Sequence, residues 1–306
     1  MLKNEFWKNR HYYFLALPAM ILYFIFTYAP MPGVIIAFKN YNFRDGIFGS
    51  PWYGLRNFQF YFQSDDFLRT TVNTLWINFN NILWETVLAV IFAIFLNEVR
   101  NNFLKRTFQI LMFLPYFFSA IIVAKFVNLL FNIDYGIINN GLSALGASPV
   151  QWYLDPKYWV KILVGAHLWR NVGYSVIIYL ATITGIDSEL FEASSIDGAS
   201  RLRQIKHILF PNLVPAIITL VLLAIGRIFF GNFQLIYAIT ENNGSLIPTT
   251  DVIETYIYRS VNGTGGGASN FGLLGAVGLY QSVVGFILVF GSNLIVKKYD
   301  KDYSLF

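Results

Sequence analysis

Cysteine is absent from this chain of 306 residues, and charged residues are scarce at 13%. The absence of cysteine excludes disulfide bonds, thiolate metal ligands and cysteine nucleophiles. Only three histidines are present and they are widely separated, so a histidine-rich metal site is not expected. A soluble domain of this length usually carries about 25% charged residues. With 56% hydrophobic residues, the composition therefore indicates an integral membrane protein.

The chain also lacks the Gly-x-x-x-x-Gly-Lys-Ser/Thr motif of phosphate-binding loops, which excludes ATP binding by that route. No long polar segment separates the apolar runs, so no soluble domain for capturing a solute is expected. A membrane-embedded enzyme would need acid, base or metal groups that converge inside the membrane. One glutamate and one histidine in the apolar runs offer little for this, and we expect a non-catalytic chain without a cofactor or metal of its own.

Six apolar runs are long enough to cross a hydrocarbon core of about 30 Å, which takes about 20 residues. They are approximately 12–38, 71–97, 107–131, 159–183, 212–238 and 271–296. Peptide groups in the bilayer must bond to one another, so these runs are predicted to be helices. The first run is too long for a signal peptide and lacks a cleavage site. The sequence predicts an all-α membrane protein, with six transmembrane helices in a single domain over 1–306.

The orientation is predicted from the basic residues of the loops, because Lys and Arg concentrate on the cytoplasmic side. Of the 22 Lys and Arg residues, twelve fall in segments on the side of the N-terminus and seven in the longer loops opposite. The other three, Lys125, Arg170 and Arg227, lie within the runs. We therefore expect a multi-pass protein of the plasma membrane with both termini in the cytoplasm.

A polar stretch, EASSIDGASRLRQIKHILFP, lies between the fourth and fifth runs on this cytoplasmic side. The sequence predicts a helix over Ser188–Ile196, a turn at Gly198 and an amphipathic helix over 199–210 that ends before Pro211. We call residues 186–211 the polar hairpin. From its residues alone it could anchor to anionic lipid, read nucleic acid as a helix-turn-helix, or dock a cytoplasmic partner. Tethering to the bilayer at both ends argues against nucleic acid as a partner.

The polar hairpin resembles the cytoplasmic loop of permease subunits in binding-protein-dependent ABC importers. That family has the pattern Glu-Ala-Ala, three residues, Gly, nine residues, Ile, any residue, Leu, Pro. This chain keeps every spacing, at Glu192, Ala193, Ser194, Gly198, Ile208, Phe210 and Pro211. Serine replaces the second alanine and phenylalanine replaces the leucine, and both changes are mild. Six runs, IFGSPWYGLRNF (47–58), FLP (113–115) and DGAS (197–200, which includes Asp197) extend the likeness to carbohydrate permeases of the polysaccharide or multiple-sugar type.

The resemblance implies a type I ABC importer permease in which the hairpin is a coupling helix held in a cleft of the ATP-hydrolysing subunit. Glu192 would then offer an anionic acceptor, Ala193 and Ser194 a close-packed surface, and Gly198 the bend. Pro211 would fix the angle at which the loop meets the fifth span. The expected partners are a second, related permease, two ATP-binding subunits that hold ATP and Mg²⁺, and an extracellular solute-binding protein. The expected substrate is a carbohydrate, namely an oligosaccharide, and the chain would form half of its path.

Charged residues near mid-span mark candidates for that path, because each costs about 2.5–3.5 kcal/mol at the centre of a helix. They are Glu85, Arg170 and Arg227. Two interpretations stay open: an ion pair between Glu85 and one arginine that holds helices together, or side chains that line the path. His167 is expected to be a hydrogen-bonded packing residue.

Amides in the spans are further candidates, since a polyhydroxylated solute needs fixed donors and acceptors. The segment RIFFGNFQLIY (227–237) combines Arg227, Asn232 and Gln234 with aromatic residues, and it is the preferred substrate-contacting segment. Gln281 in the sixth run is added to this set. Amides in spans also bond helix to helix, which is the alternative for each.

Two alternative interpretations of the chain as a transporter stay open. An ion-coupled secondary transporter would use Glu85 and the arginines as a relay, and it usually shows an internally repeated fold. No repeat is visible, and the hairpin pattern argues against this class. An ABC permease for a solute other than a sugar is the second alternative, because the carbohydrate assignment comes from the resemblance alone.

Overall fold

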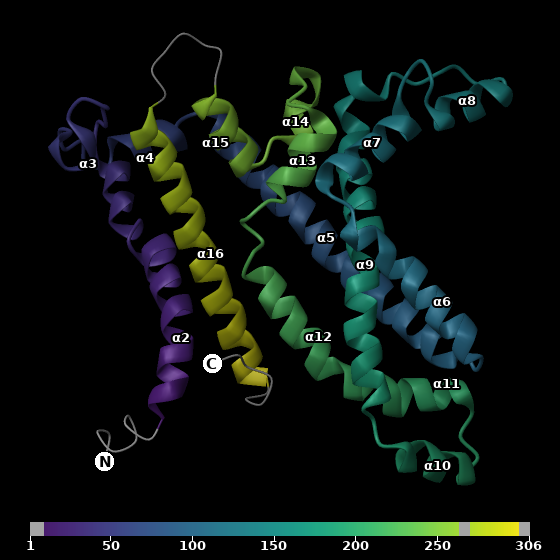
Figure 1. The fold of residues 1–306 in the computed structure, drawn as a ribbon. Coiled ribbons are helices and arrows are strands. Elements are labelled where there is room, and N and C mark those ends of the chain that lie inside the picture. The colour runs from purple at the N-terminus through teal and green to yellow at the C-terminus, as the bar shows by residue number, and fades with distance from the viewer. Residues whose placement is uncertain (1–8, 263–269, 300–306) are drawn as a thin grey trace. The chain divides into compact units, whose positions relative to one another are not determined.

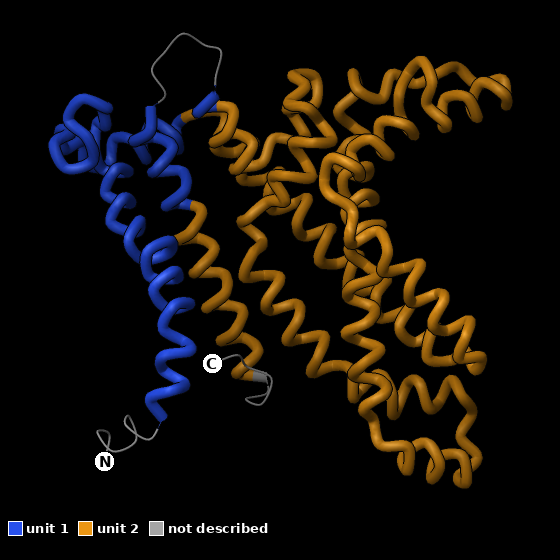
Figure 2. The backbone as a smooth tube through the Cα atoms, in the orientation of Figure 1, with its two compact units in different colours: residues 1–63, 260–280 blue, residues 64–259, 281–306 orange. Residues whose placement is uncertain are grey.

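The computed structural model describes residues 9–262 and 270–299. The chain divides into two compact units, one with 1–63 and 260–280 and the other with 64–259 and 281–306 (Figure 2). Within the described residues the regular structure is helical, apart from one isolated β-bridge between Lys39 and Trp52. The all-α class predicted from the sequence is confirmed. Both chain ends, whose cytoplasmic location was predicted, lie outside the described residues.

The first unit opens with an apolar helical stretch over Arg10–Phe38. Its helices are α2 (Arg10–Tyr23), η1 (Phe24–Tyr28), η2 (Met31–Phe38), α3 (Gly46–Gly49) and α4 (Arg56–Phe62). The buried Asn57 side chain donates to the backbone oxygens of Ala37 and Lys39, at 2.9 and 3.0 Å. This amide therefore fixes the turn that follows the stretch, because its two donors satisfy two buried carbonyl groups.

The second unit holds the remaining helices (Figure 1). In chain order these are α5 (Asp65–Glu98), α6 (Asn102–Phe113), η3 (Leu114–Phe117), α7 (Ala120–Phe131), α8 (Ile137–Ala144), η4 (Trp152–Leu154), η5 (Pro156–Tyr158), α9 (Trp159–Thr184), α10 (Ser188–Ile196), α11 (Arg201–Gln204), η6 (Ile205–Leu209), α12 (Phe210–Ile225), α13 (Phe233–Thr240), η7 (Gly244–Leu246) and α14 (Ile247–Thr250). Two further helices, α15 (Ile253–Val261) and α16 (Phe271–Tyr299), begin in one unit and end in the other.

Four helices of the described residues are long and apolar enough to cross a membrane. They are Arg10–Phe38, Asp65–Glu98, Arg201–Ile225 and Phe271–Lys298. A fifth is obtained when α6 and η3 are joined to α7, across a bend of 101°. The predicted fourth span corresponds to α9, whose 26 residues extend about 39 Å at 1.5 Å per residue. α9 is not among the helices that meet the apolar criterion, and the number six stays a prediction.

Two of the predicted runs are interrupted, which corrects the expectation of one helix for each. The run 107–131 breaks after η3, which contains Pro115, because proline has no N–H and its ring hinders the preceding turn. Ser119 then caps α7 by accepting from the Ile122 N–H at 3.4 Å. The run 212–238 breaks between Ile225 and Phe233, and its helix begins earlier than predicted, at Arg201.

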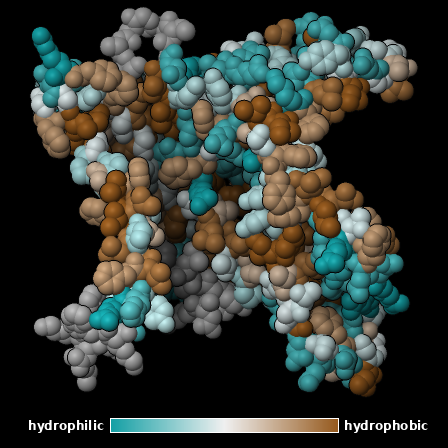
Figure 3. Space-filling view, viewed as in Figure 1, coloured by the Kyte–Doolittle hydropathy of each residue, from teal (hydrophilic) through white to brown (hydrophobic). Residues whose placement is uncertain are grey.

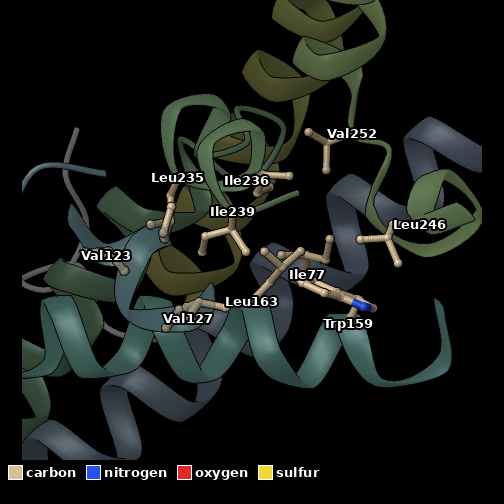
Figure 4. Packing of buried hydrophobic residues seen from close by; sticks show 12 residues of the cluster. Ile77, Val123, Val127, Trp159, Leu163, Leu235, Ile236, Ile239, Leu246 and Val252 are labelled. Atoms are coloured by element: carbon tan, nitrogen blue, oxygen red, sulfur yellow. The ribbon is translucent and has the colours of Figure 1, made fainter. Parts of the chain in front are cut away.

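The second unit has two clusters of buried apolar side chains, one toward each end of α9. The first joins α5, α7, α9 and α13 around Trp159 and Leu163 (Figure 4). The second joins α5, α9, η6 and α12 around Val176 and Leu213. Between spans such side chains stabilise mainly by close van der Waals packing, because lipid tails are as apolar as they are. These two clusters hold α9 against α5 along its length and leave the polar residues of both helices between them.

Candidate functional site

The polar hairpin folds as the sequence predicts up to its turn. Asp187 caps α10, since its carboxylate accepts from the Glu189 N–H at 3.0 Å. Gly198 follows with φ +75°, a left-handed conformation that a residue with a Cβ resists. In Figure 3 hydrophilic surface gathers over α10 and α11, at the lower end of the second unit. The helix over Ser188–Ile196 and the glycine turn are therefore confirmed.

Most residues of the matched pattern lie at the surface of the hairpin. Glu192, Ala193, Asp197, Gly198, Phe210 and Pro211 are exposed, whereas Ser194 and Ile208 are half-buried. The side chain of Ile196, 87% exposed, stands among them at the tip. Apolar side chains exposed beside a carboxylate give the hairpin both contact area and an acceptor for a partner protein.

A buried glutamine that the sequence analysis missed joins the two arms of the hairpin. The amide of Gln204 donates to the Phe191 carbonyl at 3.2 Å and to the Ser194 and Ser195 hydroxyls at 2.8 and 2.9 Å. Its oxygen accepts from Arg201 at 2.8 Å. Spacing alone could not reveal this role, because one glutamine in a charged stretch looks like a solvated residue.

Arg201 also ties the hairpin to the rest of the second unit. Its Nε donates to Glu98 at the end of α5, over 2.7 Å. Both side chains are partly exposed, so the pair contributes little stability by itself and mainly fixes geometry. The hairpin is thus held at two points, one inside it and one on a membrane helix.

The second arm of the hairpin does not end where the sequence predicts. The amphipathic helix was expected to finish at Phe210, with Pro211 marking the entry to a separate span. In the structure α11, η6 and α12 form one helix over Arg201–Ile225. η6 is a π turn in which the Phe210 N–H bonds to the Ile205 carbonyl. Pro211 has no N–H to donate. The helix can continue past it because Pro211 lies in the first turn of α12, directly after the π turn.

A cavity of about 440 Å³ lies among α5, α9 and α12 of the second unit. Its polar lining consists of Glu85, Thr86, Tyr174, Ser175, Tyr179 and Arg227. The Glu85 carboxylate meets the His167 Nε2 at 2.8 Å and accepts from the Ser175 hydroxyl at 2.6 Å. This size suits a small ligand or one or two sugar units, and the lining supplies donors, acceptors and two phenol rings.

The two span arginines stand apart from Glu85. Within the part of the chain that the structure describes, Glu85 pairs with His167 and no ion pair joins it to Arg170 or Arg227. The ion-pair interpretation for Glu85 is therefore wrong, and His167 is confirmed as a hydrogen-bonded residue. Arg227 is exposed and lines the cavity, whereas Arg170 is half-buried and its Nε is buried without a partner.

The three predicted amides occupy different surroundings. Asn232 accepts from the Leu235 N–H at 3.3 Å and so caps α13, while Gln234 is exposed. Gln281 is buried and donates to the Phe229 carbonyl at 2.5 Å and to Glu254 at 2.8 Å. Of the six path candidates the structure brings only Arg227 and Glu85 to the cavity lining, and a substrate contact stays a prediction for all six.

No group of three or more His, Cys, Asp or Glu residues that could hold a metal ion occurs among the described residues. Three groups of polar residues in the second unit are relevant to function: the hairpin, the cavity and the interrupted fifth span. All three belong to a helical chain with an exposed polar hairpin at one end and a polar cavity between its helices.

Residues 85–301 match the family model of the binding-protein-dependent transport system inner membrane component. The chain therefore belongs to this family of transporter permease subunits. The matched range contains the polar hairpin, the interrupted span and all of the cavity lining except Ile82.

Relatives and a solved structure cover nearly the whole chain. Protein LplB of Bacillus subtilis is 35% identical over 96% of this chain and 91% of its own length. The polygalacturonan/rhamnogalacturonan transport system permease protein YteP of the same species is 33% identical over 96% and 90%. One chain of the bacterial alginate ABC transporter, solved in complex with alginate pentasaccharide-bound periplasmic protein, is 30% identical with a TM-score of 0.87. That match covers 97% of this chain and 98% of the other.

Proposed function

We propose that this chain is the permease subunit of an ATP-driven importer for a carbohydrate, and that it forms half of the translocation path. The observation that carries the proposal is the polar hairpin, which keeps the family spacing and stands exposed at the end of a membrane helix. The carbohydrate class is supported by YteP, whose name specifies polygalacturonan and rhamnogalacturonan, and by the solved alginate transporter.

The hairpin would dock a separate ATP-hydrolysing subunit, which binds ATP and Mg²⁺. Glu192 and Ala193 are exposed on α10, and the capped helix and the Gln204 bonds hold them in one geometry. A rigid element transmits a push from a partner better than a mobile loop does. Because the helix continues from Arg201 into the membrane, one continuous helix would carry a movement of the hairpin to the cavity.

The cavity would form this chain's share of the path. Arg227, Glu85 and Ser175 provide donors and acceptors for hydroxyl groups, and Tyr174 and Tyr179 provide aromatic faces. Arg170, Asn232, Gln234 and Gln281 keep their place as weaker candidates for contacts along the path.

The expected assembly contains a second permease, two ATP-binding subunits and a solute-binding protein outside the membrane. The solved alginate transporter, with its periplasmic protein, supports the last of these. With the hairpin facing the ATP-binding subunits, both termini would lie in the cytoplasm, and the protein would be a multi-pass protein of the plasma membrane.

Substitutions in the hairpin test the coupling role in the assembled transporter. Glu192→Lys reverses an exposed charge, and Gly198→Pro cannot adopt the positive φ, since proline fixes φ near −65°. Both should abolish substrate-stimulated ATP hydrolysis and uptake, whereas Asp134→Asn in another exposed loop should change neither. Normal hydrolysis and uptake in both hairpin variants would contradict the docking assignment.

A further inference from the structure

The interrupted part of the fifth span, residues 226–232, has backbone groups that its own helix does not satisfy. Unpaired peptide groups at membrane depth cost several kcal/mol, so such a segment persists only where other protein groups bond to it. Three side chains from three other helices do so here. They are Asn78 of α5, Glu254 of α15 and Gln281 of α16.

These three residues bond to four consecutive backbone positions. Asn78 donates to the carbonyls of Ile228 and Phe230, at 2.8 and 3.3 Å. Gln281 donates to the carbonyl between them, that of Phe229, at 2.5 Å. We refer to Asn78, Glu254 and Gln281 as the clasp. Its two amides replace the helical hydrogen bonds that these carbonyls have lost.

Glu254 is the member of the clasp that joins its other parts. Its Oε1 accepts from the Gly231 N–H at 2.5 Å and from the Gln281 amide at 2.8 Å. The second oxygen, Oε2, is buried and has no hydrogen-bond partner within the described residues. A Cβ at position 231 would lie 2.7 Å from this oxygen, so the close approach needs glycine there. Burial raises the pKa of this carboxyl, although the bonds from Gln281 and Gly231 oppose the rise.

The start of α15 is itself fixed to α5, which makes Glu254 a rigid anchor. The Ile253 N–H donates to the Thr74 hydroxyl at 3.0 Å, and this hydroxyl is buried. Asp251, two residues earlier, bonds Arg259 of the same helix and Arg69 of α5. Because the start of α15 is fixed to α5, the Glu254 carboxylate has little freedom to move. It can therefore position the groups to which it bonds.

We propose that Glu254 is a positioning residue which, through the clasp, holds the fifth span unwound and thereby sets where Arg227 stands in the cavity. The proposal rests on the proposed function only in treating the cavity as part of the path. It also assigns a role to α15, because a displacement of that helix must move the carboxylate bonded to Gly231. Gln281 then acts on the path through the backbone of the fifth span, whose Phe229 carbonyl it holds.

The absence of cysteine gives a direct readout of this geometry. An Arg227→Cys chain, assembled with its partner subunits in membrane vesicles, is treated with a positively charged, water-soluble methanethiosulfonate, and the rate of modification is measured. The cysteine-free chain in the same assembly supplies the background. Adding Glu254→Ala should lower the rate of modification about tenfold. The loss of one charge-assisted hydrogen bond is expected to reduce the population of the unwound conformation by about this factor. Glu241→Gln, at an exposed carboxylate, should leave the rate unchanged.

Two conservative variants keep the proposal open to contradiction if Glu254→Ala does not assemble. Gln281→Glu sets a carboxylate against both the Glu254 carboxylate and the Phe229 carbonyl, and should lower the rate of modification. Glu254→Gln keeps an oxygen that accepts from the Gly231 N–H and from the Gln281 amide, and should leave most of the rate intact. Equal rates in the parent and Gln281→Glu, or a loss in Glu254→Gln as large as in Gln281→Glu, would overturn the clasp. Neither result depends on uptake, so a wrong substrate class or a failed coupling assignment would be seen separately.

Discussion

Asp251 is a single buried residue whose side chain joins two helices of the second unit. Its carboxylate has no exposed surface, and it receives two bonds from Arg259, at 2.9 and 2.7 Å, and one from Arg69 at 3.1 Å. Thr255 donates to it as well, at 2.9 Å. The bonds from Asp251 raise the pKa of Arg259 above its ordinary value, and the guanidinium stays charged. The ion cluster thus fixes α15 to α5.

Asp251→Asn should destabilise the protein, because an amide removes the anionic partner of Arg259 and leaves Arg69 with Asp66 alone. Breaking a buried ion pair costs about 3–5 kcal/mol. We expect a clear fall in the melting temperature of the detergent-solubilised transporter. Lys157→Gln removes an exposed pair with Asp155 and is the matched control, expected to melt as the parent does. Equal melting of the Asp251 variant and the parent would show that the ion cluster carries no stability.

At the scale of elements, the sequence predicts helices well and their interruptions poorly. α10 begins and ends at the predicted residues because Asp187 and Gly198 are local signals. The break in the fifth span depends on Asn78, Glu254 and Gln281, which lie far away in the sequence and are brought there only by packing. No spacing within 212–238 could reveal them. The same holds for the pairing of Glu85 with His167, 82 residues apart.

The hairpin arms should separate when the glutamine between them is removed. Gln204→Ala deletes the three bonds that its amide donates to α10. Backbone amides of 192–197 should then exchange hydrogen about tenfold faster, because local opening becomes easier. Hydrogen exchange followed by mass spectrometry measures this, and His207→Gln at an exposed position is the control. Unchanged exchange would mean that the arms are held by something other than Gln204.

For the whole molecule, composition indicated a membrane protein and the helices agree, yet most of their apolar surface is exposed in the single chain. Only 6% of the most apolar stretch of the helix Arg10–Phe38 is buried within the chain. For the helix Arg201–Ile225 the buried share is 17%. Lipid or other protein must cover the rest, since apolar surface of this extent is unstable in water. The number of spans and the side on which each loop lies depend on that environment.

Sidedness can be measured because the chain offers no cysteine of its own. Ile196→Cys on the hairpin and Leu145→Cys after α8 place thiols at positions 87% and 86% exposed. A membrane-impermeant maleimide should label Leu145→Cys in intact cells and Ile196→Cys only in inverted vesicles. Labelling of Ile196→Cys in intact cells would place the hairpin outside and remove the coupling role.

The helix over Arg201–Ile225 has a consequence for how work travels through the protein. Its 25 residues form one continuous helix from the glycine bend to the residue before the unwound segment, with the π turn η6 inside it. A small tilt at its Arg201 end becomes a larger sideways displacement at its Ile225 end. The clasp holds the residues that follow, so this displacement would be passed on to α5, α15 and α16.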